Sequence, residues 1–208
     1  MREFLKKAWS KFLTAFGDVK VFSWPMFFVY DPCYFKMTGD KILDVVALLQ
    51  PGDVLLRGYD GYLDGAFIKS KRSYSHAGVY VGKNEIVHAI APKVEKTGVV
   101  DFCECDRVAV LRPVRGQRKA VATARGFLKD GVPYDFFFGK GTSALYCFEL
   151  ARECYPGLVV GTTRISGPFG IFGKDVVLSD DFFRSKDFRL VFEYNPKYGI
   201  DFQAPGAA

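Results

Sequence analysis

The sequence predicts a single main domain of the α+β class. Its 208 residues suffice for one hydrophobic core, and no stretch resembles a linker long enough to separate two folding units. Hydrophobic residues make up 49% of the chain and charged residues 25%, a balance typical of folded globular proteins. Short segments with strand-like patterns follow one another between residues 53 and 111, with helical patterns before and after them. Such grouped strands and helices are typical of α+β folds.

The first 50 residues are predicted to form an added segment in front of this domain, which we place at residues 51–208. Within residues 2–16 the apolar side chains recur at helical spacing, and four basic residues lie largely off that face. This pattern predicts an amphipathic helix that lies on an anionic membrane, or one that packs on its own domain. Residues 21–35 are rich in aromatics and broken by two prolines, so we expect an irregular covering segment there.

The remaining elements are predicted from periodicity and from turn residues. Strands are expected where apolar residues alternate or form short β-branched runs, and helices where they recur every three or four residues. Thr142 or Ser143 is a natural cap for the helix that contains the sequence LYCFEL. We expect helices at 41–49, 61–70, 117–129, 144–154 and 180–184, and strands at 53–56, 76–81, 85–90, 99–102, 107–111 and 188–194.

The chain contains two histidines, and both fall on one predicted hairpin. A three-residue turn at 82–84 would place His76 opposite Ile90 and bring His88 to the same face. Diagonal neighbours of this kind lie about 7–8 Å apart at their Cα atoms, so two imidazoles that lean together can meet. A two-residue turn would instead put them on opposite faces of the sheet. On a shared face they can act as a base and the group that orients it.

Cys147 is the best candidate for a nucleophile among the five cysteines, because it falls near the start of a predicted helix. There the helix dipole favours a thiolate. Cys154 lies at the other end of that helix, and Cys33 resembles a packing residue in the aromatic segment. Cys103 and Cys105 form a C-x-C pair, but no second pair has zinc-site spacing, so we expect no metal site. The alternative for Cys147 is a buried structural thiol.

Six motifs occur in a fixed order over about two-thirds of the chain. They are PGDVLLRG, YSHAGVYVG, IVHA, VAVLRP, GVPYDFFF and LYCFEL. Together with the tail motif VLSDDFF they resemble the YiiX-like circularly permuted papain-fold amidases of the NlpC-like superfamily. The resemblance implies a permuted papain-like fold, in which a small antiparallel sheet packs against helices. It also implies that the strands bearing the histidines precede the helix bearing the cysteine.

The resemblance further implies a role for each candidate site residue. Cys147 would be the nucleophile, His76 its base, and His88 the polar group that orients the base. Tyr134 in GVPYDFFF would form a wall of the substrate site. Phe148 departs from the family pattern, because a serine often follows the cysteine in these proteins. The implied activity is hydrolysis of an amide or ester through a thioester acyl-enzyme, with neither metal nor cofactor.

The acyl substrate and the acceptor of the acyl group remain open. Related families include the lecithin retinol acyltransferase group, so a peptide, an amide and a lipid are all candidate substrates. The 21 phenylalanines, the 11 tyrosines and the N-terminal helix favour a lipid at a membrane. From a different functional class, the same cleft could serve a catalytically idle module that binds lipid or peptide.

Charge and targeting signals complete the expectations. The net charge of +6 and the pI of about 9.0 favour acidic partners, yet no nucleic-acid-binding motif accompanies the basic residues of the helix at 117–129. We therefore expect no nucleic-acid partner. An odd number of cysteines, no apolar run of 18 residues and no secretory signal predict a cytoplasmic protein, with peripheral contact to an anionic membrane left open.

Overall fold

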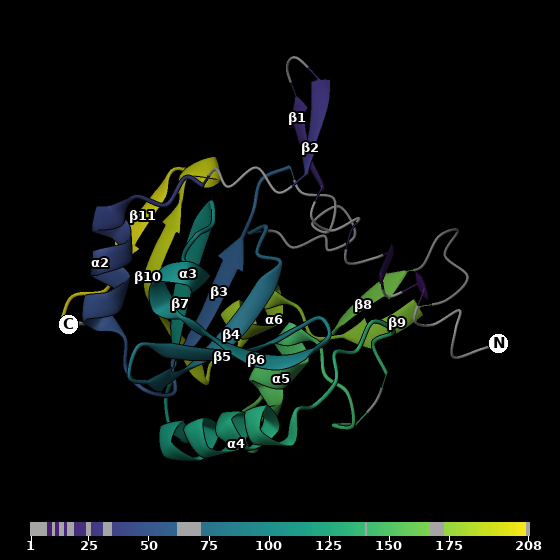
Figure 1. The fold of residues 1–208 in the computed structure, drawn as a ribbon. Coiled ribbons are helices and arrows are strands. Elements are labelled where there is room, and N and C mark those ends of the chain that lie inside the picture. The colour runs from purple at the N-terminus through teal and green to yellow at the C-terminus, as the bar shows by residue number, and fades with distance from the viewer. Residues whose placement is uncertain are drawn as a thin grey trace.

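The central element is a seven-stranded antiparallel sheet with the strand order β11-β10-β7-β3-β4-β5-β6 (Figure 1). The computed structural model describes residues 35–61, 72–139, 141–166 and 173–206, and shorter pieces at 8–9, 11–12, 15, 19–23 and 26–30. The sheet, with helices beside it, confirms the α+β class. Its strands are β3 (Val54–Gly58), β4 (His76–Gly82), β5 (Glu85–Ile90), β6 (Lys93–Gly98), β7 (Arg107–Pro113), β10 (Phe188–Asn195) and β11 (Ile200–Gln203).

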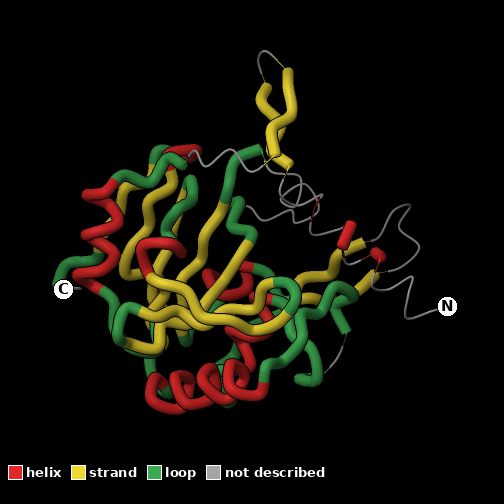
Figure 2. The backbone as a smooth tube through the Cα atoms, in the orientation of Figure 1, coloured by secondary structure: helices red, strands yellow, loops and turns green. Residues whose placement is uncertain are grey.

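Helices cover both faces of this sheet (Figure 2). One face packs against α4 (Gln117–Asp130), α5 (Cys147–Glu153) and α6 (Ser179–Arg184). The opposite face packs against α2 (Gly39–Leu48) and the short α3 (Val99–Phe102). Both faces of the central strands are therefore buried.

Alternation along each central strand divides the core into two clusters. On β3, Val54 and Leu56 lie in the cluster with α4, α5 and α6, whereas Leu55 lies in the cluster with α2 and α3. All three side chains are fully buried. Because successive side chains point to opposite faces, a strand covered on both faces consists of consecutive apolar residues. This explains why VLL at the start of β3 shows no polar alternation.

The prediction of a strand at 99–102 was wrong. These residues form α3, and its buried side chains Val99 and Phe102 lie three positions apart on one helical face. The strand precedes it as β6, an edge strand on which Lys93, Glu95 and Lys96 are exposed. β-Branched valines favour strands locally, but packing on the sheet decides between the two states. A polar edge strand gives little hydrophobic signal in a sequence.

The covering segment at 21–35 was also expected to be irregular, and this was wrong for most of it. β1 (Val19–Ser23) and β2 (Met26–Tyr30) pair in antiparallel register, and Figure 1 shows this hairpin projecting from the main sheet. A second small hairpin, β8 (Thr163–Ser166) and β9 (Gly173–Val176), and the 3₁₀ turn Pro196–Tyr198 before β11 were not predicted.

The N-terminal predictions fall partly outside the described residues. Residues 62–70 of the helix expected at 61–70 lie outside them, and so does Cys33. Of the amphipathic helix expected at 2–16, five residues are described, and they are helical and exposed: Ala8, Trp9, Lys11, Phe12 and Ala15. The helix α2, which we assigned to the added segment, packs on the sheet through Val45 and Leu48. The domain boundary at residue 50 stays a prediction.

Membrane-spanning segments can be assessed for the part of the chain that the structure describes. None of the helices there is both long enough and apolar enough to cross a bilayer.

Candidate active site

The β4–β5 hairpin brings the two histidines together, although by a different turn from the one expected. The loop contains two residues, Lys83 and Asn84, and both have positive φ angles, of 56° and 60°. This is the conformation of a type I′ turn. The expectation of a three-residue turn was therefore wrong. A regular ladder continued from a two-residue turn would have placed the imidazoles on opposite faces.

A register shift between Tyr80 and Gly82 restores the strand pairing that the sequence analysis expected. The shift gives β4 one extra residue, Val81, and beyond it Val79 faces Val87. A three-residue turn would have produced this same pairing. Because a bulge adds one residue to one strand, it reverses the facing of every residue that follows. The short turn and the bulge together therefore leave His76 and His88 on one face.

The two imidazoles form a direct hydrogen bond. Nε2 of His76 lies 2.8 Å from Nδ1 of His88, and the ring planes are nearly perpendicular, at 86°. Both rings also pack around Phe102 of α3, with centroid distances of 5.8 and 5.7 Å. His88 is buried, whereas His76 is partly exposed. His76 is therefore the member of the pair that substrate can reach.

Gly78 makes room for this pair. It lies between His76 and Tyr80 on β4, across from His88. A Cβ atom at Gly78 would lie 2.5 Å from Cγ2 of Ile86 and 3.3 Å from Cβ of His88. The missing side chain is therefore what allows the His88 imidazole to lean across the strand pair toward His76.

We expect Gly78→Ala to lower the free energy of unfolding by about 1–3 kcal/mol, the usual cost of forcing extra atoms into a packed core. Urea unfolding followed by circular dichroism measures the effect. Gly126→Ala in α4 is the matched control, because nothing lies within 4 Å of the added methyl group. In that helix interior the same substitution should stabilise by up to about 1 kcal/mol. Equal shifts for both variants would contradict the close approach at Gly78.

Cys147 is the first residue of α5, as the prediction of a helix-start position required. The helix begins later than expected, however, with Tyr146 at the capping position instead of Thr142 or Ser143. The thiol donates to the carbonyl oxygen of Ser75, with Sγ and O 3.8 Å apart. The backbone amides of Ala77, of Phe148 and of Cys147 itself face the sulfur. The nucleophile candidate thus contacts the main chain on both sides of His76.

The thiol and the imidazoles reach β4 from opposite faces. Ala77 lies in the core cluster that contains Cys147, whereas the adjacent His76 contacts Phe102 on the side of α3. The pairs of β4 and β5 extend from Val79 toward the turn and do not include Ala77. Beyond Val79 the main chain of β4 is therefore open to the thiol along the edge that faces β5.

Electrostatics favours neutral forms of all three groups in the free protein. Burial raises the pKa of the Cys147 thiol to about 12, although the surrounding amides act in the opposite direction. Burial, the Arg57 cation and His88 hold the pKa of His76 well below its usual value. Burial, followed by Arg57, lowers the pKa of His88 to about 3. At neutral pH the arrangement is thus a thiol beside an uncharged imidazole pair.

The hydrogen bond between the rings determines which nitrogen is left to act. If Nε2 of His76 carries the proton and donates to Nδ1 of His88, then Nδ1 of His76 is an unprotonated acceptor. This tautomer gives His76 a lone pair for a proton from a nearby acid. His88, which is itself neutral, accepts the hydrogen bond before and after that transfer.

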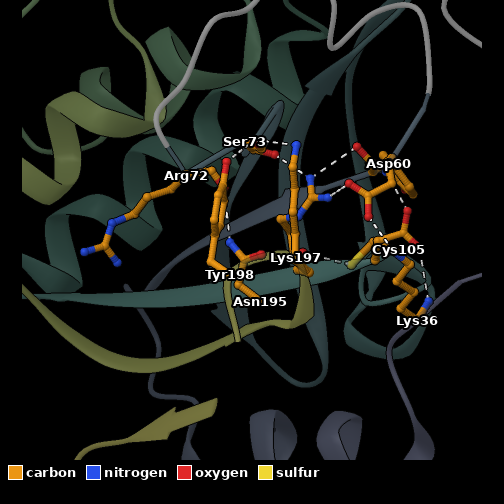
Figure 3. Close-up of polar contacts among 11 residues, drawn as sticks. Lys36, Asp60, Arg72, Ser73, Cys105, Asn195, Lys197 and Tyr198 are labelled. Carbon is orange, nitrogen blue, oxygen red and sulfur yellow. Dashed lines mark hydrogen bonds and ion pairs between the residues drawn. The ribbon is translucent and has the colours of Figure 1, made fainter. Parts of the chain in front are cut away.

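The chain leading into His76 is held at four consecutive carbonyl groups, one donor for each. Figure 3 shows the start of this segment, with Asn195 beside Arg72 and Ser73. The donors come from β7, β10, α5 and α6, so elements far apart in sequence converge on this segment. Each bond fixes one peptide plane just before the imidazole. The pairs are Asn195 Nδ2 with Arg72 O (3.1 Å), Arg107 Nη1 with Ser73 O (2.7 Å), Ser179 Oγ with Tyr74 O (3.3 Å) and Cys147 Sγ with Ser75 O (3.8 Å).

Tyr134 lies beside the chain that leads to the nucleophile. It forms an isolated parallel bridge with Leu145, two residues before Cys147, and its amide donates to the carbonyl oxygen of Pro92 at 2.9 Å. Its ring is partly buried and packs on Phe136 at 4.8 Å. This position is compatible with a wall of the site.

The other described cysteines are enclosed in the core. Cys103, Cys105 and Cys154 are fully buried, and burial raises the pKa of all three thiols, that of Cys103 to about 12. The C-x-C pair belongs to the core between the sheet, α2 and α3. Within the described residues, no three or more His, Cys, Asp or Glu side chains cluster in a way that could hold a metal ion.

Two charged residues near the site were missed by the sequence analysis. Arg57 pairs with His76 across β3 and β4, and its guanidinium lies 4.7 Å from the Phe102 ring centre. Glu149 is a buried carboxyl two residues after Cys147, and burial raises its pKa to about 7. The one available signal was Arg57 itself, a charge that follows the buried run VLL. Nothing in the sequence marked Glu149, because helical charges are usually solvated.

Comparisons with known proteins agree with this architecture. The family model described as permuted papain-like amidase enzyme, YaeF/YiiX, C92 family, matches residues 48–192. The crystal structure of the metalloprotein YiiX from Escherichia coli O157:H7 superposes with a TM-score of 0.58 at 24% identity. That match covers 70% of this chain and 97% of YiiX.

Two viral proteins are also similar in sequence. Protein OPG091 of variola virus (isolate Human/India/Ind3/1967) is 27% identical over 128 residues, which is 58% of this chain and 72% of the viral protein. Protein OPG091 of vaccinia virus (strain Copenhagen) matches to the same extent. The family match includes both histidine strands and the cysteine helix, in the permuted order. The chain therefore belongs to the permuted papain-like amidase family of YaeF and YiiX, a family of cysteine-type amidases and peptidases.

Proposed function

We propose that this protein cleaves an amide or ester acyl bond with Cys147 as nucleophile, His76 as general base and His88 as the group that orients His76. The observation that carries the proposal is the 2.8 Å contact between the two imidazoles, next to a thiol that contacts the main chain on both sides of His76. These are the parts that nucleophilic catalysis by cysteine requires: a nucleophile, a base and an orienting partner for the base.

Acylation would begin with a neutral thiol. When substrate enters, the thiol leaves the Ser75 carbonyl and passes its proton to Nδ1 of His76 around the edge of β4 that faces β5, while sulfur bonds to the carbonyl carbon. The negative charge develops on the former carbonyl oxygen, and the backbone amides at the start of α5 would receive it. The imidazolium then protonates the leaving amine or alkoxide, and the carbonyl re-forms as a thioester on Cys147.

Deacylation would reverse the roles of the same groups. His76, neutral again, takes a proton from water or from another acceptor, and that oxygen or nitrogen attacks the thioester. The thiol is released with the proton from His76. Throughout, His88 accepts the hydrogen bond from the Nε2–H group of His76. This hydrogen bond keeps Nδ1 of His76 directed toward the reacting groups. Tyr134 would line the acyl side of the cleft.

Trapping of the acyl-enzyme tests this proposal. A short-chain p-nitrophenyl ester should give a burst of p-nitrophenol and one acyl adduct, located on Cys147 by mass spectrometry after an acid quench. Cys147→Ala should give neither, whereas Cys154→Ala, at the other end of the same helix, should behave as wild type. Absence of any adduct with esters and amides alike would favour the alternative, a catalytically idle module that binds lipid or peptide in this cleft.

The acyl substrate is proposed to be a lipid, and the protein is proposed to bind peripherally to an anionic membrane. Trp9 and Phe12 support this, because both rings are about half exposed and stack on each other at 5.4 Å. The same trapping assay compares phospholipid vesicles with peptide and amide substrates. Trp9→Glu with Phe12→Glu should abolish co-sedimentation with anionic vesicles and leave ester turnover in solution unchanged. Faster acylation by a peptide would make peptide the better assignment.

A further inference from the structure

Arg57 differs from three other arginines of the described residues, two of them buried and one partly exposed. Arg107 pairs with Asp60, Arg112 with Asp53, and the Arg72 guanidinium with Glu193. Arg57 is partly buried, yet within the described residues its guanidinium has no carboxylate at ion-pair distance. Its one hydrogen bond there is from Nη1 to the carbonyl oxygen of Phe102 at 3.4 Å, and its Nε is buried without a partner.

The guanidinium lies among the groups to which we assign the reaction. Arg57 faces His76 in the β3–β4 register, and its guanidinium packs on the Phe102 ring that both imidazoles contact. It also packs near the ring of Tyr59, at 5.4 Å. Its charge reaches far enough to favour the thiolate of Cys147 and to oppose protonation of both histidines.

An uncompensated cation beside a base has a chemical cost. It disfavours the imidazolium that must form when His76 accepts the thiol proton, and among the described residues its own donors have few acceptors. A ligand anion would reverse both effects, since it supplies the missing counter-charge and the missing acceptors. The planar guanidinium suits carboxylate and phosphate oxygens, which accept from its fork in parallel.

We propose that Arg57 is a substrate-binding residue, and that the substrate carries a carboxylate or a phosphate close to its scissile carbonyl. This inference rests on the function proposed above, because it takes Cys147 as the attacking atom. An anionic oxygen group held by Arg57 lies on the imidazole side of β4, and the carbonyl lies at the thiol. Substrates without an anionic group are then acylated more slowly, whatever their acyl chain.

Two alkylating reagents of the same size test the proposal without knowledge of the substrate. Iodoacetate carries a carboxylate next to the reacting carbon, whereas iodoacetamide is neutral. The ratio of their rate constants at Cys147, read by mass spectrometry, should fall about tenfold in Arg57→Gln, as expected for loss of one charge-assisted contact. Arg57→Lys should retain part of the ratio. Arg115→Gln removes an equal charge beyond the far end of β7 and should leave the ratio unchanged.

The outcomes separate this inference from the proposed function. If Cys147 reacts with neither reagent faster than Cys103, Cys105 and Cys154 do, and His76→Asn changes nothing, the proposed function fails. If Cys147 reacts in a His76-dependent way but the ratio is the same in wild type and Arg57→Gln, the anion site alone is overturned.

If Arg57→Gln does not fold, a competition experiment on the wild-type protein at constant ionic strength decides. Acetate or inorganic phosphate should slow iodoacetate more than iodoacetamide, and the stronger competitor distinguishes carboxylate from phosphate. No slowing by either anion would refute the site.

Discussion

Replacing His76 with asparagine should slow alkylation of Cys147 by iodoacetamide about 10²–10³-fold at pH 7, the usual contribution of a positioned general base. Asparagine can still hydrogen-bond to His88, but it cannot accept a proton at neutral pH. Because burial raises the pKa of the Cys147 thiol to about 12, the free thiolate is rare at pH 7. Without the base, reaction depends on that rare form.

The pH dependence gives the sharper test of the same prediction. In the wild-type protein the pKa of His76 is held well below its usual value, so the base is neutral from pH 6.5 to 8.5 and the rate should be nearly flat there. Acidification slows the reaction only where His76 gains a proton, well below pH 6.5. In His76→Asn the rate should instead rise about tenfold per pH unit, because the thiolate fraction does.

Two controls accompany this measurement. His88→Asn retains the base and loses only the partner that orients it, so it should slow alkylation less than His76→Asn does. Cys154, fully buried just after the end of the same helix, should stay unlabelled in the folded protein. Identical rates and identical pH profiles in wild type and His76→Asn would show that His76 is not the base for Cys147.

The largest effect on stability is expected at Asp53. Asp53→Ala should lower the free energy of unfolding by about 3–5 kcal/mol, because it leaves the buried Arg112 cation without its counter-charge. Nε and Nη2 of Arg112 each lie 2.9 Å from an oxygen of Asp53, and Nη2 also donates to the carbonyl of Leu48 at 2.6 Å. The ion pair therefore joins β3 and β7 to the end of α2.

Urea unfolding measures this effect against two comparisons. Asp201→Ala breaks an exposed pair with Lys41 and should cost at most about 1 kcal/mol. Asp53→Ala combined with Arg112→Met removes both charges and should recover part of the stability lost in the single variant. If the loss for Asp53→Ala is no larger than that for Asp201→Ala, the pair of Asp53 and Arg112 stabilises the fold no more than an exposed ion pair does.

The spacing of apolar residues in the sequence predicted most of the helices and strands. The hairpin strands at 76–81 and 85–90 and the helix at 117–129 were placed within one residue at each end, because both have clear periodicity and strong turn residues. The order of the motifs also indicated the family. Elements with weak signals were missed or wrongly assigned, among them the polar edge strand β6 and the short helix α3. For these, packing against the sheet outweighs local preference.

The candidate site shows the same division. The sequence contains two histidines 12 positions apart and one cysteine at a helix start, and these facts make the three residues the candidates for the site. It did not reveal the two-residue turn, because Gly82-Lys83-Asn84 is compatible with either turn length. Only the bulge at Val81, which depends on how β4 fits against its neighbours, restores the shared face of the imidazoles.

The sequence by itself therefore determined the α+β class and the family, and it named Cys147, His76 and His88 as candidate site residues, because these depend on residue types and on spacing along the chain. The tertiary structure decided how those residues meet. It placed the thiol and the imidazoles on opposite faces of β4, and it brought Arg57 beside them. Both depend on contacts between residues far apart in sequence. Burial and charge environment, and with them the pKa values of the site, arise from such long-range contacts, for which no local pattern exists.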